Sequence, residues 1–219
     1  MGRPKQFIEL LGIPALHFTL RAFEESAEVA RIYAVGDRPR IEALVQASNI
    51  TKYAACAEPG EARSFSTRNG LLLCEEDPDT IVLVHDGSRC LVTPALIGRV
   101  VRAAGGDSEP DGVVPGLFVS DTIKVVSEGT VTETLDRTNL FAVQTPQAFR
   151  LGLLRRLHDS PEELLRTATD DASLVEREGG RVAVVAGEKT NIKLTSPEDL
   201  VFAEAILAVR EGATREVRT

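Results

Sequence analysis

The stretch Ile81-Val82-Leu83-Val84-His85-Asp86 decides the fold. Its first four residues form an unbroken apolar run that is rich in β-branched side chains and bounded by polar residues. Such a run is typical of a strand that is covered on both faces in a parallel sheet. Similar short runs recur along the chain, at residues 31–35, 53–56, 112–114 and 182–185.

Helical segments lie between these runs, and three of them have an explicit start signal. Thr93-Pro94, Ser160-Pro161 and Ser196-Pro197 each place a capping hydroxyl before a proline, and Asp199 follows Ser196 at nearly the spacing of a capping box. Alternating strands and helices predict right-handed βαβ units. We therefore expect one α/β domain over residues 1–219, with a Rossmann-like, doubly wound, mostly parallel sheet that binds ligands at the carboxyl ends of its strands.

One stretch breaks this alternation. Residues 121–126 and 131–136 alternate in polarity around a glycine-containing turn at 127–130, so they predict a protruding β-hairpin arm over 121–136. A two-stranded hairpin is marginally stable alone in water. We therefore expect the arm to pack on a partner subunit.

Composition and charge narrow the functional classes. The 219 residues carry 25 Lys and Arg against 33 Asp and Glu, a net charge of −8, so nucleic acid is not the expected partner. No run approaches the ~20 apolar residues of a membrane span, and Met1 is not followed by a signal-peptide segment. A cytoplasmic protein without membrane contact is expected.

The three cysteines, Cys56, Cys74 and Cys90, lack Cys-x-x-Cys spacing, which argues against disulfides or a zinc site.

Four charged residues are candidates for chemistry. Asp86 ends the apolar run, where a carboxylate can hold a divalent metal, although a turn or capping aspartate fits the same pattern. Arg89 could reach an anion at the same place or simply lie on the surface. The chain has only five lysines, so Lys5 and Lys193 stand out as phosphate ligands, with solvated surface charges as the alternative.

Seven segments occur in the order and spacing that are typical of one family. They are Pro4-Lys5-Gln6-Phe7, Val84-His85-Asp86 with Arg89, Asp121-Thr122-Ile123-Lys124, Thr134-Leu135-Asp136-Arg137, Gln144-Thr145-Pro146-Gln147-Ala148-Phe149, Thr169-Asp170-Asp171-Ala172-Ser173-Leu174, and the segment from Asn191 to Leu200. Over essentially its whole length the chain resembles the 2-C-methyl-D-erythritol 4-phosphate cytidylyltransferases.

The resemblance implies an enzyme that transfers a cytidylyl group from CTP to a sugar-alcohol phosphate, 2-C-methyl-D-erythritol 4-phosphate, in the non-mevalonate isoprenoid pathway. It implies a homodimer whose hairpin arm carries residues into the neighbouring site, and Mg²⁺ held by Asp86. The implied catalytic residues are Lys5, Arg137 and Lys193. The implied nucleotide-binding residues are Gly60, Glu61, Arg63, Ser66 and Asp86. The implied sugar-phosphate ligands are Arg89, Thr122, Arg137, Thr169 and Lys193.

The chain departs from the family pattern at three places. Pro59-Gly60 stands where a Gly-Gly pair is usual, and Cys90 follows Arg89 where proline is usual. The family's first strand and Gly-rich triphosphate loop have no counterpart before Met1, so we expect the chain to lack both and to be a poor catalyst. Two alternatives stay open: cytidylyl transfer to ribitol 5-phosphate, and a truncated, non-catalytic dimeric homologue.

Overall fold

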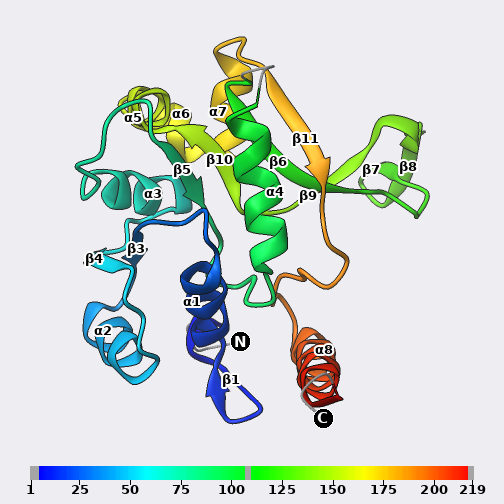
Figure 1. Cartoon of the computed structure of the whole chain (residues 1–219). Coiled ribbons are helices and arrows are strands. Elements are labelled where there is room, and N and C mark those ends of the chain that lie inside the picture. The colour runs from blue at the N-terminus through cyan, green and yellow to red at the C-terminus, as the bar shows by residue number, and fades with distance from the viewer. Residues whose placement is uncertain (1–4, 107–109, 217–219) are drawn as a thin grey trace.

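Strands form at each of the apolar runs, and helices lie between most of them (Figure 1). The computed structural model describes residues 5–106 and 110–216. The strands are β1 (Glu9–Leu10), β2 (Ile13–Pro14), β3 (Ile32–Val35), β4 (Tyr53–Ala57), β5 (Ile81–Val84), β6 (Gly112–Phe118), β7 (Lys124–Ser127), β8 (Thr130–Thr134), β9 (Phe141–Val143), β10 (Gln147–Arg150) and β11 (Val182–Ala186). The α-helices are α1 (Ala15–Glu25), α2 (Arg38–Ala47), α3 (Arg63–Leu71), α4 (Pro94–Ala104), α5 (Leu151–His158), α6 (Glu162–Arg166), α7 (Asp171–Arg177) and α8 (Pro197–Glu216). Two 3-10 turns, η1 (Lys5–Phe7) and η2 (Arg137–Asn139), complete the order.

The main sheet has the strand order β11-β6-β10-β5, with β9 paired to β6. β11 runs parallel to β6, whereas β10 is antiparallel to both β6 and β5. β5, β6 and β11 therefore point in one direction and β10 runs against them. The predicted α/β fold with a mostly parallel sheet is confirmed.

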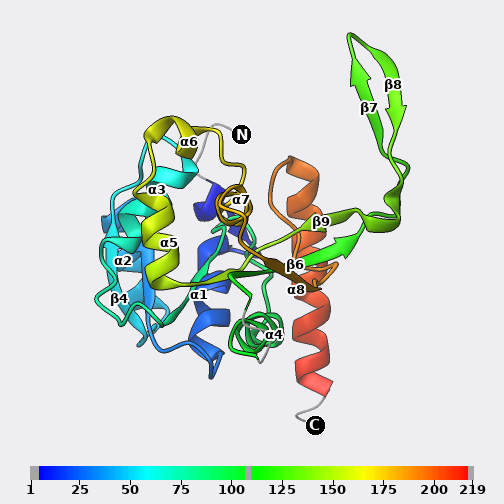
Figure 2. The ribbon, with the colours of Figure 1, turned by 90° about the horizontal axis from the view of Figure 1, so that it is seen from above.

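Helices cover both faces of this sheet, as Figure 2 shows. The alternation of side chains along β5 explains why. Ile81 and Leu83 pack into the cluster that contains α1 and α4, while Val82 and Val84 pack into the cluster formed by α3, α5, α6 and α7. An apolar run without polar interruptions is thus what a strand between two helical layers requires.

The edge of β5 that is not paired with β10 is open. Among the described residues β3 pairs only with β4, and the pair is not hydrogen-bonded to β5. A cavity of about 900 Å³ lies between them, and every residue of β3 and β5 lines it. The expectation that residues 81–84 are fully covered is therefore only partly right: both faces are packed, yet all four residues stay half-buried because this edge meets the cavity.

The start signals have two outcomes. Thr93 caps α4, since its Oγ1 accepts a hydrogen bond from Leu96 N at 3.1 Å, and Asp199 Oδ2 accepts from Ser196 N at 2.7 Å at the start of α8. The prediction at Ser160 is wrong. α6 begins at Glu162 after an extended Pro161 with a ψ angle of 140°, and no side chain caps it.

The hairpin arm is confirmed, and it projects from the body of the molecule (Figures 1 and 2). β7 and β8 are joined by Glu128 and Gly129, whose φ angles are 49° and 78°. Positive φ at both turn positions is the geometry of a tight hairpin turn whose twist matches the strands. Every residue of the two strands is exposed, so the arm has no packing partner within the described chain.

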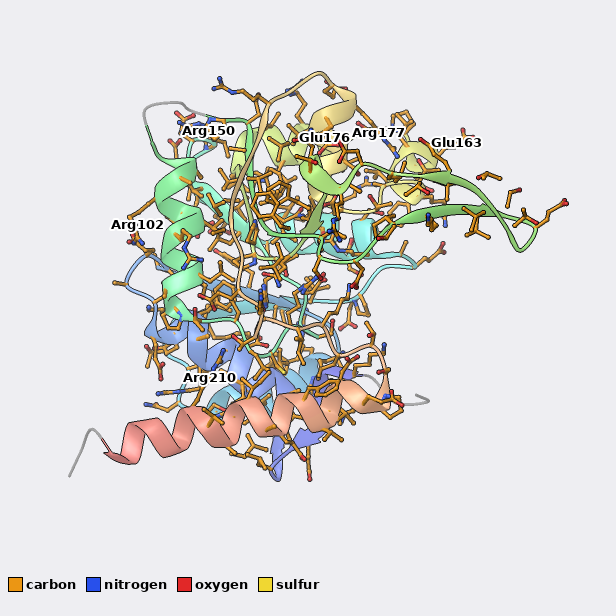
Figure 3. The ribbon with its side chains drawn as sticks, turned by 90° about the vertical axis from the view of Figure 1, so that its right-hand side faces the viewer. Arg102, Arg150, Glu163, Glu176, Arg177 and Arg210 are labelled. Carbon is orange, nitrogen blue, oxygen red and sulfur yellow. The ribbon has the colours of Figure 1, made fainter. Side chains whose placement is uncertain are left out.

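The long helix α8 lies across one end of the molecule (Figure 3). Arg210, labelled there, donates hydrogen bonds to Leu91 O and Thr190 Oγ1, both at 3.0 Å. Leu194, Ala203 and Leu207 bury apolar surface against the segment around Leu91. In the part of the chain that the structure describes, no helix combines the length and apolar character needed to cross a bilayer.

Candidate active site

Asp86 lies at the centre of a cluster of cations. It lies two residues after Val84, at the carboxyl end of β5. Lys193 Nζ lies 2.9 Å from Asp86 Oδ2, Arg63 Nε lies 3.3 Å from Oδ1, and Arg89 Nε lies 3.9 Å from Oδ2. One carboxylate faces three cations, so the cluster carries excess positive charge and suits an anionic ligand such as a phosphate.

The environment of Asp86 keeps it ionised. Burial opposes the charged form, but the hydrogen bond from Lys193 and the charge of Arg63 outweigh it and hold the pKa of Asp86 below its usual value. Burial likewise opposes the charge on Arg63, yet Asp171 and Asp86 raise its pKa above the ordinary range. The site therefore presents full charges of both signs at neutral pH.

His85 is a neutral side chain whose hydrogen bonds hold the loop after β5. Burial lowers the pKa of His85 to about 4. Its Nε2 lies 3.1 Å from Arg89 O, and because a carbonyl can only accept, Nε2 carries the hydrogen. Nδ1 then accepts from Thr145 Oγ1 at 3.0 Å, and the same hydroxyl accepts from Asp86 N at 3.1 Å. This chain of hydrogen bonds fixes the backbone that carries Asp86.

Most of the Arg89 guanidinium is engaged in hydrogen bonds to the backbone. Its Nη1 donates to Asn191 O at 2.9 Å and its Nη2 to Val143 O at 3.4 Å. Burial lowers the pKa of Arg89. The guanidinium thus joins the loop after β5 to the segment that precedes α8, and this brings Lys193 to Asp86.

Two cavities meet at this cluster. The larger, of about 900 Å³, runs from between β3 and β5 to the loop after β5, while the smaller measures about 210 Å³. Arg63, Asp86 and Lys193 line both of them. These three side chains therefore form a single wall between the cavities, the shared wall.

Four of the other predicted residues line one cavity or the other. Lys5 and Ser66 line the larger one, and Thr169 and Arg89 line the smaller one. Lys5 Nζ also donates to Thr195 O at 3.1 Å, which places it beside the segment that carries Lys193.

Gly60 and Glu61 line neither cavity. Gly60 N donates to Ser66 Oγ at 3.0 Å, and an added Cβ would collide with Phe65, so close packing explains the glycine. The Glu61 side chain is exposed and pairs with Arg166 at 2.9 Å. The structure therefore does not bring the Glu61 carboxylate to the cluster.

Thr122 lies on the arm and Arg137 directly follows it, and both are outside the two cavities of this chain. Thr122 precedes β7, and Arg137 begins η2 and donates to Ser120 O. Their position is consistent with a role in another subunit but supplies nothing to the site of their own chain.

Sequence reasoning missed the side chains that hold the cluster. Asp171 Oδ2 accepts from Arg63 Nη1 at 2.7 Å, and its Oδ1 lies 2.9 Å from His158 Nε2. Gln147 Nε2 donates to Asp170 Oδ2 at 2.7 Å at the rim of the smaller cavity. Asp171 stands in a quoted motif, but a pair of adjacent aspartates does not reveal which of them is buried.

An α/β sheet with cations gathered around one carboxylate at a strand's carboxyl end is typical of a protein that binds phosphate groups. Comparisons with known proteins specify the class. A sequence profile of the 2-C-methyl-D-erythritol 4-phosphate cytidylyltransferases matches residues 1–209. A protein of that name from Rubrobacter xylanophilus is 66% identical over 96% of this chain and 90% of its own length. Another from Geobacillus kaustophilus is 45% identical over 95% of this chain and 91% of its own length.

Solved structures agree. The enzyme of that name from Thermus thermophilus is 33% identical and has a TM-score of 0.77, with 94% of each chain covered. The one from Francisella tularensis is 31% identical and has a TM-score of 0.79, with 92% of each chain covered. The chain belongs to the 2-C-methyl-D-erythritol 4-phosphate cytidylyltransferase family.

Membership settles the reaction class. The chain is a nucleotidyltransferase of isoprenoid biosynthesis that transfers a cytidylyl group from CTP to 2-C-methyl-D-erythritol 4-phosphate, and the family uses a divalent metal. The ribitol 5-phosphate and non-catalytic alternatives are not favoured. The expectation that an N-terminal strand and phosphate loop are missing is not borne out by these comparisons.

Proposed function

We propose that the shared wall is where the two substrates react, with CTP in the larger cavity and the sugar-alcohol phosphate in the smaller one. The observation that carries this proposal is that Arg63, Asp86 and Lys193 line both cavities. The larger volume, about 900 Å³, is within the usual range for a ligand site. The residues that the resemblance implies for each substrate, Lys5 and Ser66 against Arg89 and Thr169, divide in the same way.

The reaction is an in-line displacement at phosphorus. A phosphate oxygen of 2-C-methyl-D-erythritol 4-phosphate attacks the α-phosphorus of CTP, the bond from that phosphorus to the β-bridging oxygen breaks, and pyrophosphate leaves with the bonding electrons. The protein contributes positioning and charge stabilisation, because phosphoryl transfer needs little covalent help. Lys193 and Arg63 hold the two phosphates together at the shared wall, and Lys5 neutralises charge on the triphosphate.

The residues present fit a divalent metal, which we propose is Mg²⁺. Asp86 offers an ionised, partly exposed carboxylate, and oxygen is the ligand that Mg²⁺ prefers. Among the described residues there is no group of three or more potential ligands, so one protein carboxylate would act with phosphate oxygens and water. When bound, the metal withdraws charge from the phosphate oxygens. Lys193 and Arg63 contact the same carboxylate, so they lie where they can meet the substrate phosphates beside it.

We further propose that the chain is one nucleotidyltransferase domain over residues 1–219 that works in the cytoplasm as a homodimer through the arm at 121–136. Val125, Val126 and Val131 are 41%, 56% and 54% exposed on a hairpin whose strands are exposed throughout. Apolar surface of this kind marks an interaction site. In the dimer, Thr122 and Arg137 would reach the partner's sugar phosphate.

The test is pyrophosphate release. We expect release only when CTP, Mg²⁺ and 2-C-methyl-D-erythritol 4-phosphate are all present, loss on chelation, and little turnover with ribitol 5-phosphate. Equal turnover of the two acceptors would contradict the substrate assignment.

Sedimentation tests the role of the arm. A Val126→Lys chain should sediment as a monomer where the parent sediments as a dimer, and an unchanged sedimentation coefficient would contradict the role of the arm.

A further inference from the structure

Arg63 is held by two carboxylates. It is the first residue of α3, and its Nε lies 3.3 Å from Asp86 Oδ1 while its Nη1 lies 2.7 Å from Asp171 Oδ2. The Asp171 side chain is only 1% exposed, whereas that of Arg63 is 33% exposed and reaches the shared wall. Within the described ranges Nη2 of Arg63 has no hydrogen-bond acceptor, so that nitrogen is left to meet a ligand.

His158 completes this arrangement from the end of α5. Its Nε2 lies 2.9 Å from Asp171 Oδ1, and its side chain is 1% exposed. Burial opposes the charge on Asp171, but the hydrogen bond from His158 and the charge of Arg63 prevail and keep its pKa below the usual value. An ionised carboxylate has no hydrogen, so Nε2 of His158 donates. Both oxygens of Asp171 are thereby engaged, and its carboxylate cannot turn away from Arg63.

Neither Asp171 nor His158 lines the two cavities of the site. Capping of α7 does not explain Asp171 either, because Asp170 fills that role by accepting from Ser173 N at 3.0 Å. A buried ion pair contributes little net stability after its desolvation cost, and its best-attested use is to fix a particular arrangement. What this pair fixes is the direction of Arg63.

We propose that Asp171 and His158 are positioning residues for cytidylyl transfer: they hold the Arg63 guanidinium at the shared wall, where it orients Asp86 and meets a phosphate. This inference rests on the proposed function of the shared wall. It predicts that the pair acts on the reaction only through Arg63, although both residues lie outside the cavities.

The first test is a double-mutant cycle. Asp171→Asn should lower kcat about 10- to 100-fold, with a smaller change in the KM for either substrate, because a catalytic group misplaced by about 1 Å has effects of that size. In an Arg63→Ala background the same substitution should have almost no further effect. If the two losses multiply, Asp171 does not act through Arg63 and the proposal is wrong.

His158 provides a second test that keeps the buried charge. His158→Gln places an amide donor near the position of Nε2 and should retain most of the kcat, whereas His158→Leu removes the donor and should lower kcat about 3- to 10-fold. If Asp171→Asn does not fold, this pair decides the question. Equal kcat values for the Gln and Leu variants would overturn the proposal.

Val175→Ala is the matched control for destabilisation of α7. Val175 is 1% exposed on the same helix, and its apolar side chain takes no part in the hydrogen bonds around Arg63. We expect this variant to melt at a lower temperature but to keep its kcat at a temperature where it is folded. A wild-type chain without turnover of CTP would contradict the proposed function instead, so the two failures are distinguishable.

Discussion

The ammonium of Lys193 lies 2.9 Å from the Asp86 carboxylate, although one residue follows β5 and the other precedes α8. Both residues of this pair belong to the shared wall between the two cavities. Its charges are partly screened by solvent, because 45% of the Lys193 side chain is exposed, so its contribution to stability is small. In the proposed arrangement of the substrates, the pair places both charges beside their phosphates.

The first prediction concerns Asp86. Asp86→Asn should lower turnover about 100-fold or more, since it removes the charge proposed to bind the metal and leaves Lys193 without its carboxylate partner. Steady-state pyrophosphate release across a Mg²⁺ titration measures the effect. Asp159→Asn, an exposed position at the end of α5, is the control and should behave as the parent. Near-parental turnover of the Asp86 variant would contradict its assignment.

The second prediction tests whether the arm works across the dimer. Arg137→Ala and Lys193→Ala chains should each be impaired alone, because each homodimer has two damaged sites. Mixing them should restore roughly one quarter of the parental activity, since half of randomly formed dimers have one intact site. Co-refolding followed by activity measurement is the experiment, with mass-tagged chains to verify heterodimers. Heterodimers without recovered activity would show that Arg137 does not act in trans.

The third prediction follows from the cavity between β3 and β5. Backbone amides of Ile81–Val84 and Ile32–Val35 should exchange with solvent faster than those of β6. Within the described part of the chain each of these two strands is paired on one side only, whereas β6 is paired on both. Hydrogen exchange with peptide-level mass spectrometry compares these segments within one sample. Equal protection of β5 and β6 would mean that the open edge is closed in solution.

The fourth prediction concerns the thiols. Burial raises the pKa of Cys90 to about 11 and also raises the pKa values of Cys56 and Cys74. At pH 8 the thiolate fraction of Cys90 is then about 0.1% of the total, and the thiolate is the reactive form. A thiol reagent such as Ellman's should leave the folded protein unlabelled and react with all three cysteines in guanidinium. Rapid labelling of the folded chain would contradict their burial.

The sequence alone predicts much of the architecture. The uninterrupted apolar run at 81–84 and the proline-marked helix starts predict an α/β fold. Both signals can be read from the sequence because the spacing of apolar residues in a strand or helix depends only on residues close together in the chain. The hairpin is equally readable, from alternation and its glycine turn. Ser160 gives a wrong helix start, because the extended backbone at Pro161 postpones the helix to Glu162.

Site residues are predictable only in part, and the reason is physical. Asp86 and Lys193 stand out in the sequence because a charge next to a strand end or helix start has a restricted set of uses, and Lys5 stands out because the chain has only five lysines. Glu61 carries the same kind of charge as Asp86, but only the fold shows that it turns to Arg166 on the surface.

What the sequence by itself determined is therefore the alternation of strands and helices, the hairpin arm and the small set of charges placed at their junctions. Tertiary structure alone decided that Asp171 is buried against Arg63 and His158, and that β5 faces a cavity on one edge. Local sequence patterns report which faces are apolar. They do not report which distant segment supplies the partner, because that depends on how the helices pack across the sheet.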